Sequence, residues 1–182
     1  VDYRWQRCDI KSISLIGNVL LRQVSADAGA VETILFRDGK LTEASASNVF
    51  VARNGRLLSP PKSKLILPGI TYDVVLELAA AHGLPAEVRP VAEAEARGAD
   101  ALWMPSSTKE ALPIVRLDGQ PVGQPQPVAA LRHLLDAVFP CRGQRGFEVF
   151  AHHAQMRQAP LGAGEVGAGD ELLADGVARG PA

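Results

Sequence analysis

The sequence predicts a mixed α/β (α+β) domain, and three observations support this class. Helical and strand-like periodicities are mixed along the chain, several expected strands are separated by hairpin turns, and no internal repeat is visible. The dipeptides Asp38-Gly39, Asn54-Gly55 and Asp118-Gly119 are of the kind that closes two-residue hairpins. We therefore expect a sheet that contains both hairpins and helical connections.

Apolar periodicity predicts where the individual helices and strands lie. Gly29 and Gly83 are placed to end two of the helices, because glycine readily adopts the backbone angles that terminate a helix. The expected helices are 12–28, Thr71 to Gly83, 92–98 and 128–139, and the expected strands are 31–36, 48–52, 56–58, 86–91, 101–104 and 112–117. The small, polar residues 41–47 are expected to connect two strands.

The two ends of the chain are unusual. Residues 1–139 are predicted to form one domain, whereas 140–182 are rich in Gly, Ala and Arg and lack sustained periodicity. We expect 140–182 to be an atypical, disordered tail. The chain begins with Val rather than Met, so we expect it to start partway into a longer protein.

The composition argues against several classes of protein. The formal net charge is −1 and no basic stripe is present, which argues against nucleic-acid binding. No apolar run approaches the roughly 20 residues of a membrane helix, and the N-terminus lacks the features of a signal peptide. The two cysteines, Cys8 and Cys141, have no metal-ligand spacing. We therefore expect a cytoplasmic protein without a metal site.

Two charged side chains are candidates for chemistry. Lys11 lies just before the first expected helix among apolar neighbours, where partial burial would lower the pKa of its amine and make it a nucleophile. Glu43 lies among small hydroxyl residues, where its carboxylate could bind a protonated ring nitrogen. The alternatives are a surface lysine at a helix start and a solvated hairpin glutamate, and each residue alone leaves them open.

Two further segments are candidates for binding an anion. Gly69-Ile70-Thr71 begins a helix, where free N–H groups and the helix dipole attract anions, and Thr71 suits the N-cap position. Ser106-Ser107-Thr108 follows an apolar strand and offers hydroxyls and turn amides. A simple capped helix and an ordinary turn are the alternatives. No Walker loop or dinucleotide fingerprint is present.

Several other polar and aromatic residues have structural interpretations. Glu93 and Glu95 predict a solvated helix face, and Trp5 and Trp103 predict core or interface positions. His152-His153 lacks the further ligands that a metal site needs.

Four segments, in order, resemble those of D-amino-acid transaminases, which are class IV, fold-type IV enzymes that use pyridoxal 5'-phosphate (PLP). The segments are 4–12, 42–50, 66–75 and 106–110, and they include Thr-Glu-Ala-Ser-Ala-Ser-Asn at 42–48 and Leu-Pro-Gly-Ile-Thr at 67–71. The resemblance covers roughly residues 1–139. It implies the large, cofactor-binding domain of that family, a curved, barrel-like sheet flanked by helices.

The resemblance also implies a function and a role for each residue. The implied reaction is PLP-dependent transamination between a D-amino acid, such as D-alanine, and 2-oxoglutarate, in a homodimer. Lys11 would be the Schiff-base lysine, and Glu43 would bind the pyridine nitrogen. The other implied roles are phosphate binding by Ile70 (through its N–H), Thr71, Ser106 and Ser107, lining of the ring or substrate side by Ser45 and Ser47, and a position near the active site for Arg4.

The sequence departs from the family pattern in several places. Ala44, Ala46, Tyr72 and Pro105 stand where Gly, Ser, Arg and Thr are usual. In the family a small N-terminal domain precedes these segments, so we expect this chain to be a truncated product or fragment. A branched-chain (L) aminotransferase and an aminodeoxychorismate lyase share the same segments and are the alternative enzymes. An inactive, truncated PLP-binding protein is the alternative from another class.

Overall fold

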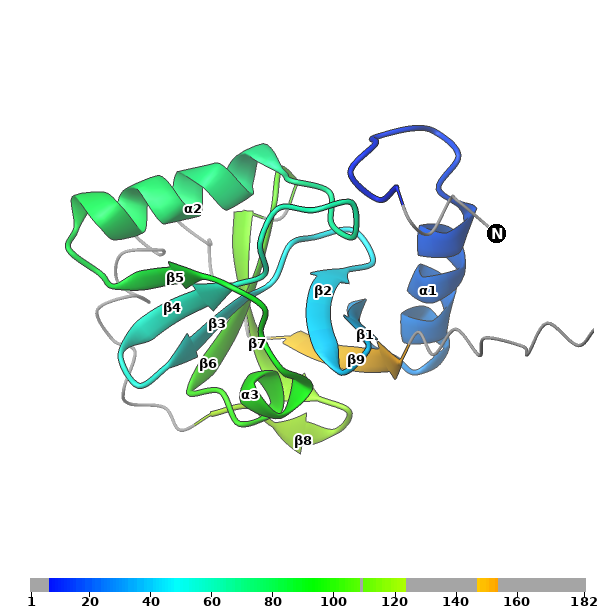
Figure 1. Ribbon diagram of the computed structural model, residues 1–182. Helices are drawn as coiled ribbons and strands as arrows, with labels where there is room; N and C mark the ends of the chain where they lie inside the picture. The colour runs from blue at the N-terminus through cyan, green and yellow to red at the C-terminus, as the bar shows by residue number, and fades with distance from the viewer. Residues whose placement is uncertain (1–6, 109, 124–146, 154–182) are drawn as a thin grey trace, which may run out of the picture.

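The structure is a computed structural model that describes residues 7–108, 110–123 and 147–153. Within these residues, one mixed sheet of nine strands carries three helices (Figure 1). The helices are α1 (Ile16–Asp27), α2 (Ile70–Ala81) and α3 (Glu93–Arg97). The strands are β1 (Glu32–Arg37), β2 (Lys40–Ala44), β3 (Phe50–Arg53), β4 (Arg56–Ser59), β5 (Ala86–Val88), β6 (Ala101–Ser106), β7 (Glu110–Leu117), β8 (Gln120–Pro121) and β9 (Phe147–His153). The predicted fold class is confirmed.

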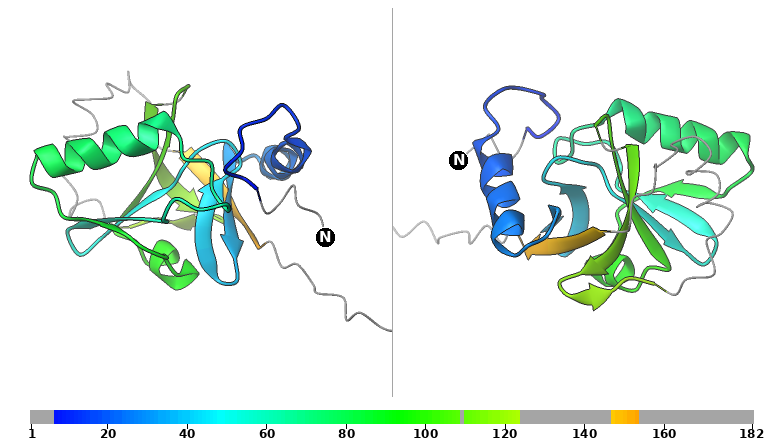
Figure 2. Two further views of the ribbon diagram at one scale, coloured as in Figure 1. Left: turned by 45° about the horizontal axis from the view of Figure 1, so that its top comes forward. Right: turned by 180° about the vertical axis from the view of Figure 1, so that it is seen from behind.

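The sheet is strongly curved, and its two ends approach each other. The strand order is β2-β1-β9-β7-β6-β3-β4-β5, with β8 paired to β7, and β1 and β2 turn away from the other strands (Figure 2). Shortly after β5, the Val91 carbonyl accepts the Leu41 N–H at 2.8 Å, and Ala92 forms a bridge with Lys40. These contacts join the last segment of the strand order to β2, as expected for a barrel-like sheet.

The three predicted hairpin turns are confirmed. They connect β1 to β2, β3 to β4, and β7 to β8. Both residues of Asp38-Gly39, Asn54-Gly55 and Asp118-Gly119 have positive φ, between 50° and 73°. This is the type I′ arrangement, whose twist matches that of the strands it joins.

The central strands are buried on both faces. Alternation along the chain sends Val49 and Val51 into one hydrophobic core and Phe50 and Ala52 into a second core beneath α2. Trp103, opposite Phe50 in the sheet, belongs to the second core, which confirms its interpretation as a core residue. Because α2 packs here, its N-terminus is held at the end of the sheet where β6 also ends (Figure 1).

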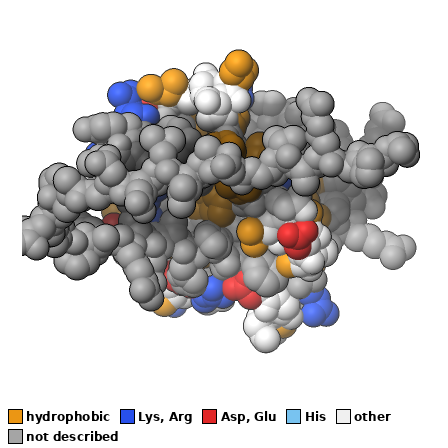
Figure 3. Space-filling view, turned by 90° about the vertical axis from the view of Figure 1, so that its right-hand side faces the viewer, with side chains coloured by type: hydrophobic (Ala, Val, Ile, Leu, Met, Phe, Trp, Pro, Cys, Tyr) orange, Lys and Arg blue, Asp and Glu red, His pale blue; other side chains and the backbone are white. Residues whose placement is uncertain are grey.

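The first helix is shorter than predicted, and its apolar side chains are exposed. α1 begins at Ile16 rather than at residue 12, and its buried residues are Gly17, Leu21 and Ser25. Side chains on which the helix prediction rested, including Val19 and Leu20, are more than half exposed, at 64% and 60%. Hydrophobic side chains accordingly reach the surface on this side of the molecule (Figure 3).

Two further predictions need correction. Residues 41–47 are only partly a connection, because β2 extends through Ala44 and pairs with β1. Within the predicted tail, residues 147–153 form strand β9, which lies between β1 and β7 and is parallel to both. The prediction from hydrophobic periodicity missed β9, because a short segment within a stretch that lacks sustained periodicity carries no local strand signal. The expected helix 128–139 and the rest of the tail lie outside the described residues.

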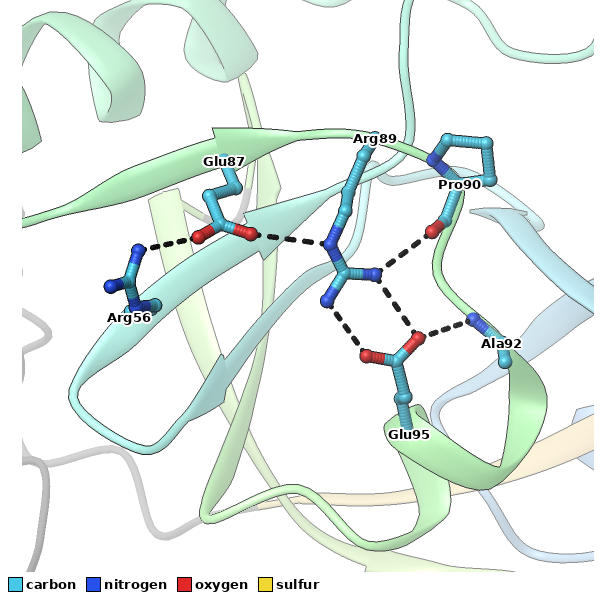
Figure 4. A network of polar contacts seen from close by, with 6 residues as sticks. All are labelled: Arg56, Glu87, Arg89, Pro90, Ala92 and Glu95. Carbon is cyan, nitrogen blue, oxygen red and sulfur yellow. Dashed lines mark hydrogen bonds and ion pairs between the residues drawn. The ribbon is translucent and has the colours of Figure 1, made fainter.

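The acidic residues of α3 are not simply solvated. Glu95 binds Arg89 through two hydrogen bonds, of 2.7 and 3.1 Å, and accepts the Ala92 N–H at 3.0 Å (Figure 4). Glu87 joins the same network by pairing with Arg89 and with Arg56. The Arg89 guanidinium holds the pKa of the Glu95 carboxyl well down, at about 2. The network fastens α3 to the segment that follows β5.

No helix in the part of the chain that the structure describes is long and apolar enough to cross a membrane.

Candidate active site

One pocket of about 620 Å³ lies where four segments meet. These segments are the loop before α1, the β2–β3 connection, the start of α2 and the end of β6. Every predicted site residue that the structure describes lines this pocket: Lys11, Glu43, Ser45, Ser47, Ile70, Thr71, Ser106 and Ser107. Arg4 lies outside the described residues. The fold therefore gathers residues that are far apart in the sequence.

Lys11 lies in the loop that leads into α1. Its side chain is exposed, so the expected partial burial is wrong for the described chain. The loop and α1 are nevertheless anchored to neighbouring segments of the pocket. The Cys8 N–H donates to the Lys64 carbonyl at 2.8 Å, and the Asn18 amide donates to the Ser45 carbonyl at 2.9 Å. The Lys11 amine is thus accessible to solvent while it lines the pocket.

Glu43 is buried rather than solvated, which rules out the hairpin alternative. It lies near the end of β2, its side chain is 6% exposed, and its Oε2 accepts the Leu67 N–H at 2.8 Å. Burial raises the pKa of the Glu43 carboxyl to about 7, while the Leu67 hydrogen bond opposes this and the charge of Glu32 adds to it. The carboxyl therefore exchanges its proton near neutral pH, and a cationic partner would stabilise its ionised form.

A second carboxylate, Glu32, lies beneath the β2–β3 connection. It is fully buried, and it accepts hydrogen bonds from the Ser47 hydroxyl (2.7 Å), the Ala46 N–H (3.0 Å) and the Ser45 hydroxyl (3.4 Å). Arg22 lies 3.6 Å away. The Ser45 and Ser47 hydroxyls thus donate to the buried Glu32 carboxylate, and both residues also line the pocket. Sequence reasoning missed Glu32, although a carboxylate that opens an apolar strand is a signal for a buried, hydrogen-bonded group.

The N-terminus of α2 faces the same pocket with its first residues. Gly69 rather than Thr71 is the N-cap, so the predicted cap is wrong and Thr71 lies in the first turn. No side chain of the described residues caps this helix. The first backbone N–H groups of a helix lack partners within the helix, so they are available to an anion. The Ser106 and Ser107 residues at the end of β6 lie on the same pocket wall.

Asn48 connects the segments that carry these groups, and sequence reasoning had given it no role. Its side chain is 6% exposed and hydrogen-bonds with both Leu67 and Gly69, while its own N–H donates to Pro105. The available sequence signal was its place in the motif at 42–48. A buried amide needs partners for both its donor and its acceptor, so an asparagine there is expected to connect neighbouring segments.

The arrangement suits a particular kind of ligand. The helix N-terminus and the serines offer an anion site, the Glu43 carboxyl offers an acceptor for a protonated nitrogen, and the Lys11 amine can react with an electrophile. In the described residues, no group of three metal-ligating side chains is present.

Comparison with known proteins identifies a family. Residues 1–117 match the amino-transferase class IV family. The D-alanine aminotransferase of Bacillus licheniformis is 43% identical over 126 residues, which are 69% of this chain and 44% of the relative. The chain thus spans less than half the length of this relative.

Solved structures are similar to the same part of the chain. A fold IV-transaminase from Curtobacterium pusillum has a TM-score of 0.65 and 34% identity, covering 71% of this chain and 44% of its own. A branched-chain amino acid aminotransferase from Thermobaculum terrenum, solved in its PLP-form, has a TM-score of 0.67 and 30% identity, covering 75% and 46%. The family match spans well over half of the sequence and the fold agrees with it, so the chain belongs to the amino-transferase class IV family.

Proposed function

We propose that this chain is the cofactor-binding part of a PLP-dependent aminotransferase that transfers amino groups between a D-amino acid, such as D-alanine, and a 2-oxo acid, such as 2-oxoglutarate. One observation carries the proposal: Lys11, Glu43 and the α2 N-terminus line a single pocket. The residues present fit PLP, because the pocket offers an amine, an acceptor for a ring nitrogen and an anion site.

Each pocket residue has a defined task in this proposal. Lys11 would hold PLP through its amine, and the Lys11 Nζ would also move the proton at the substrate α-carbon. Glu43, which accepts the Leu67 N–H through Oε2, would also accept the pyridine N–H of PLP. When bound, PLP supplies the electron sink that makes removal of this proton feasible.

The remaining residues bind and orient. The Ile70 and Thr71 N–H groups and the Ser106 and Ser107 hydroxyls hold the phosphate, because a helix N-terminus and clustered donors stabilise an anion. Ser45 and Ser47 line the ring side and are held in place by Glu32. A role for Arg4 near the substrate stays a prediction.

The substrate and the assembly are supported by different observations. The name of the Bacillus licheniformis relative supports D-alanine, whereas the similarity to branched-chain aminotransferase structures keeps an L-specific enzyme as the second candidate. A homodimer in the cytoplasm is proposed, and the exposed apolar face of α1 supports a subunit interface. A chain that binds PLP without catalysing transamination is the third candidate.

The test mixes the 182-residue chain with PLP and follows the visible absorbance of lysine-bound cofactor. We expect the wild type to be yellow, Lys11→Ala to be colourless, and the exposed Lys40→Ala control, which lies outside this pocket, to match the wild type. Bleaching by D-alanine but not by L-leucine supports the D-specific enzyme, and the reverse supports the L-specific one. A yellow protein that neither substrate bleaches is a binder only. Full colour in Lys11→Ala would refute the proposed lysine.

A further inference from the structure

The loop that precedes α2 is held by side chains from the β2–β3 region rather than by regular structure of its own. The Leu67 N–H donates to Glu43 Oε2 at 2.8 Å, and the Leu67 carbonyl accepts the Asn48 side-chain amide at 2.9 Å. The Gly69 N–H donates to Asn48 Oδ1 at 3.2 Å. One asparagine side chain therefore satisfies a donor and an acceptor two residues apart in the loop.

The contact between Asn48 and Gly69 is close-packed. A Cβ added at Gly69 would lie 2.8 Å from Asn48 Oδ1, although the φ of −73° at Gly69 would itself permit a side chain. Gly69 is the N-cap of α2, so its position determines where the Ile70 and Thr71 N–H groups point. Asn48 consequently sets the placement of the anion site.

Asn48 is itself fixed with respect to the other two parts of the pocket. Its backbone N–H donates to the Pro105 carbonyl at 3.2 Å, one residue before Ser106. Both Asn48 and Glu43 bond to Leu67, so the carboxyl and the helix N-terminus are joined through a short run of hydrogen bonds. The position of Asn48 thus couples the ring end of the pocket to its phosphate end.

We propose that Asn48 is a positioning residue that holds the α2 N-terminus and the Ser106 turn at a fixed span from Glu43, so that the phosphate and the pyridine nitrogen of PLP bind together. This inference rests on the proposed function. If Asn48 acts in this way, its removal weakens recognition of the phosphate specifically, rather than cofactor binding in general.

The test compares PLP with pyridoxal, which lacks the phosphate, by absorbance titration of the full chain. The ratio of the two dissociation constants measures how much the phosphate contributes to affinity. We expect Asn48→Ala to lower this preference for PLP about tenfold, the effect of losing well-placed hydrogen bonds to a charged group. The control is Tyr72→Phe, which deletes a buried hydrogen bond from the Tyr72 hydroxyl to the Pro60 carbonyl but does not line the pocket.

A second variant approaches the same contact from the other side. Gly69→Ala should lower the preference for PLP because its Cβ displaces Asn48, and it should have little further effect in the Asn48→Ala background, where the clash is gone. If Asn48→Ala does not fold, Gly69→Ala alone decides. An unchanged preference in these variants, or an equal fall in Tyr72→Phe, would overturn the inference. A wild type that binds PLP no better than pyridoxal would refute the proposed phosphate site, and this inference with it.

Discussion

Glu43 should make the cofactor-free protein less stable as the pH rises, and glutamine at this position should remove the effect. Burial raises the pKa of the Glu43 carboxyl from 4.5 to about 7 in the folded chain. Between these pH values the folded state binds a proton that the unfolded state has released. Linkage therefore makes the free energy of unfolding fall over this range, with the full stability present below pH 4.5 and lost above pH 7.

The size of the effect follows from the two pKa values. At about 1.4 kcal/mol per pH unit, a pKa raised from 4.5 to about 7 corresponds to about 3 kcal/mol. Glutamine has nearly the same shape, and its side-chain oxygen can still accept the Leu67 N–H, but it has no proton to lose. We expect Glu43→Gln to be more stable than the wild type by about 3 kcal/mol above pH 7, with the difference vanishing toward pH 4.5.

Urea unfolding of both proteins without PLP, in steps from pH 4.5 to above pH 7, measures this difference directly. Glu77→Gln is the matched control. Glu77 is an exposed glutamate on α2, so this substitution should leave the pH dependence of the free energy of unfolding unchanged. Adding PLP should stabilise the wild type more than Glu43→Gln, because the protonated ring nitrogen would pair with the ionised Glu43 carboxylate, and glutamine carries no charge. Parallel stability curves for the wild type and Glu43→Gln across this range would refute the reasoning about the buried carboxyl.

Three further changes can be measured by the same unfolding assay. Glu32→Ala should cost about 3 kcal/mol, because the Ser47 hydroxyl and its neighbouring donors lose a buried acceptor; a cost near zero would mean that water replaces the carboxylate. Gly55→Ala should cost about 1 kcal/mol, because φ is 72° in the β3–β4 turn, and an unchanged midpoint would contradict this. Arg89→Ala should lower the free energy of unfolding modestly at neutral pH, because the Glu95 carboxylate loses its guanidinium partner and both partners are partly exposed. That cost should disappear as the pH falls toward 2, where Glu95 becomes protonated, and a cost independent of pH would count against the ion pair.

The candidate site was accessible from sequence to an unusual degree, because its parts lie in short contiguous motifs. Glu43, the α2 start and the Ser106 turn each carry a local chemical signal, and the four matched segments placed them in one family. The sequence signals of the two supporting residues indicated at most that they are buried, and not which groups they bind. The side chains of Glu32 and Asn48 form hydrogen bonds with groups 13 to 21 residues away in the chain, so only the folded contacts show what they hold.

The sequence by itself determined the mixed class, the three hairpin turns and eight of the residues that line the pocket. These features depend on local backbone preferences, such as positive φ at Asn54-Gly55, or on motifs that keep their order along the chain. Tertiary structure alone decided that Glu43 is buried, that Lys11 is exposed and that β9 lies within the sheet. Burial and strand pairing depend on which distant segments pack together, and no local pattern contains that information.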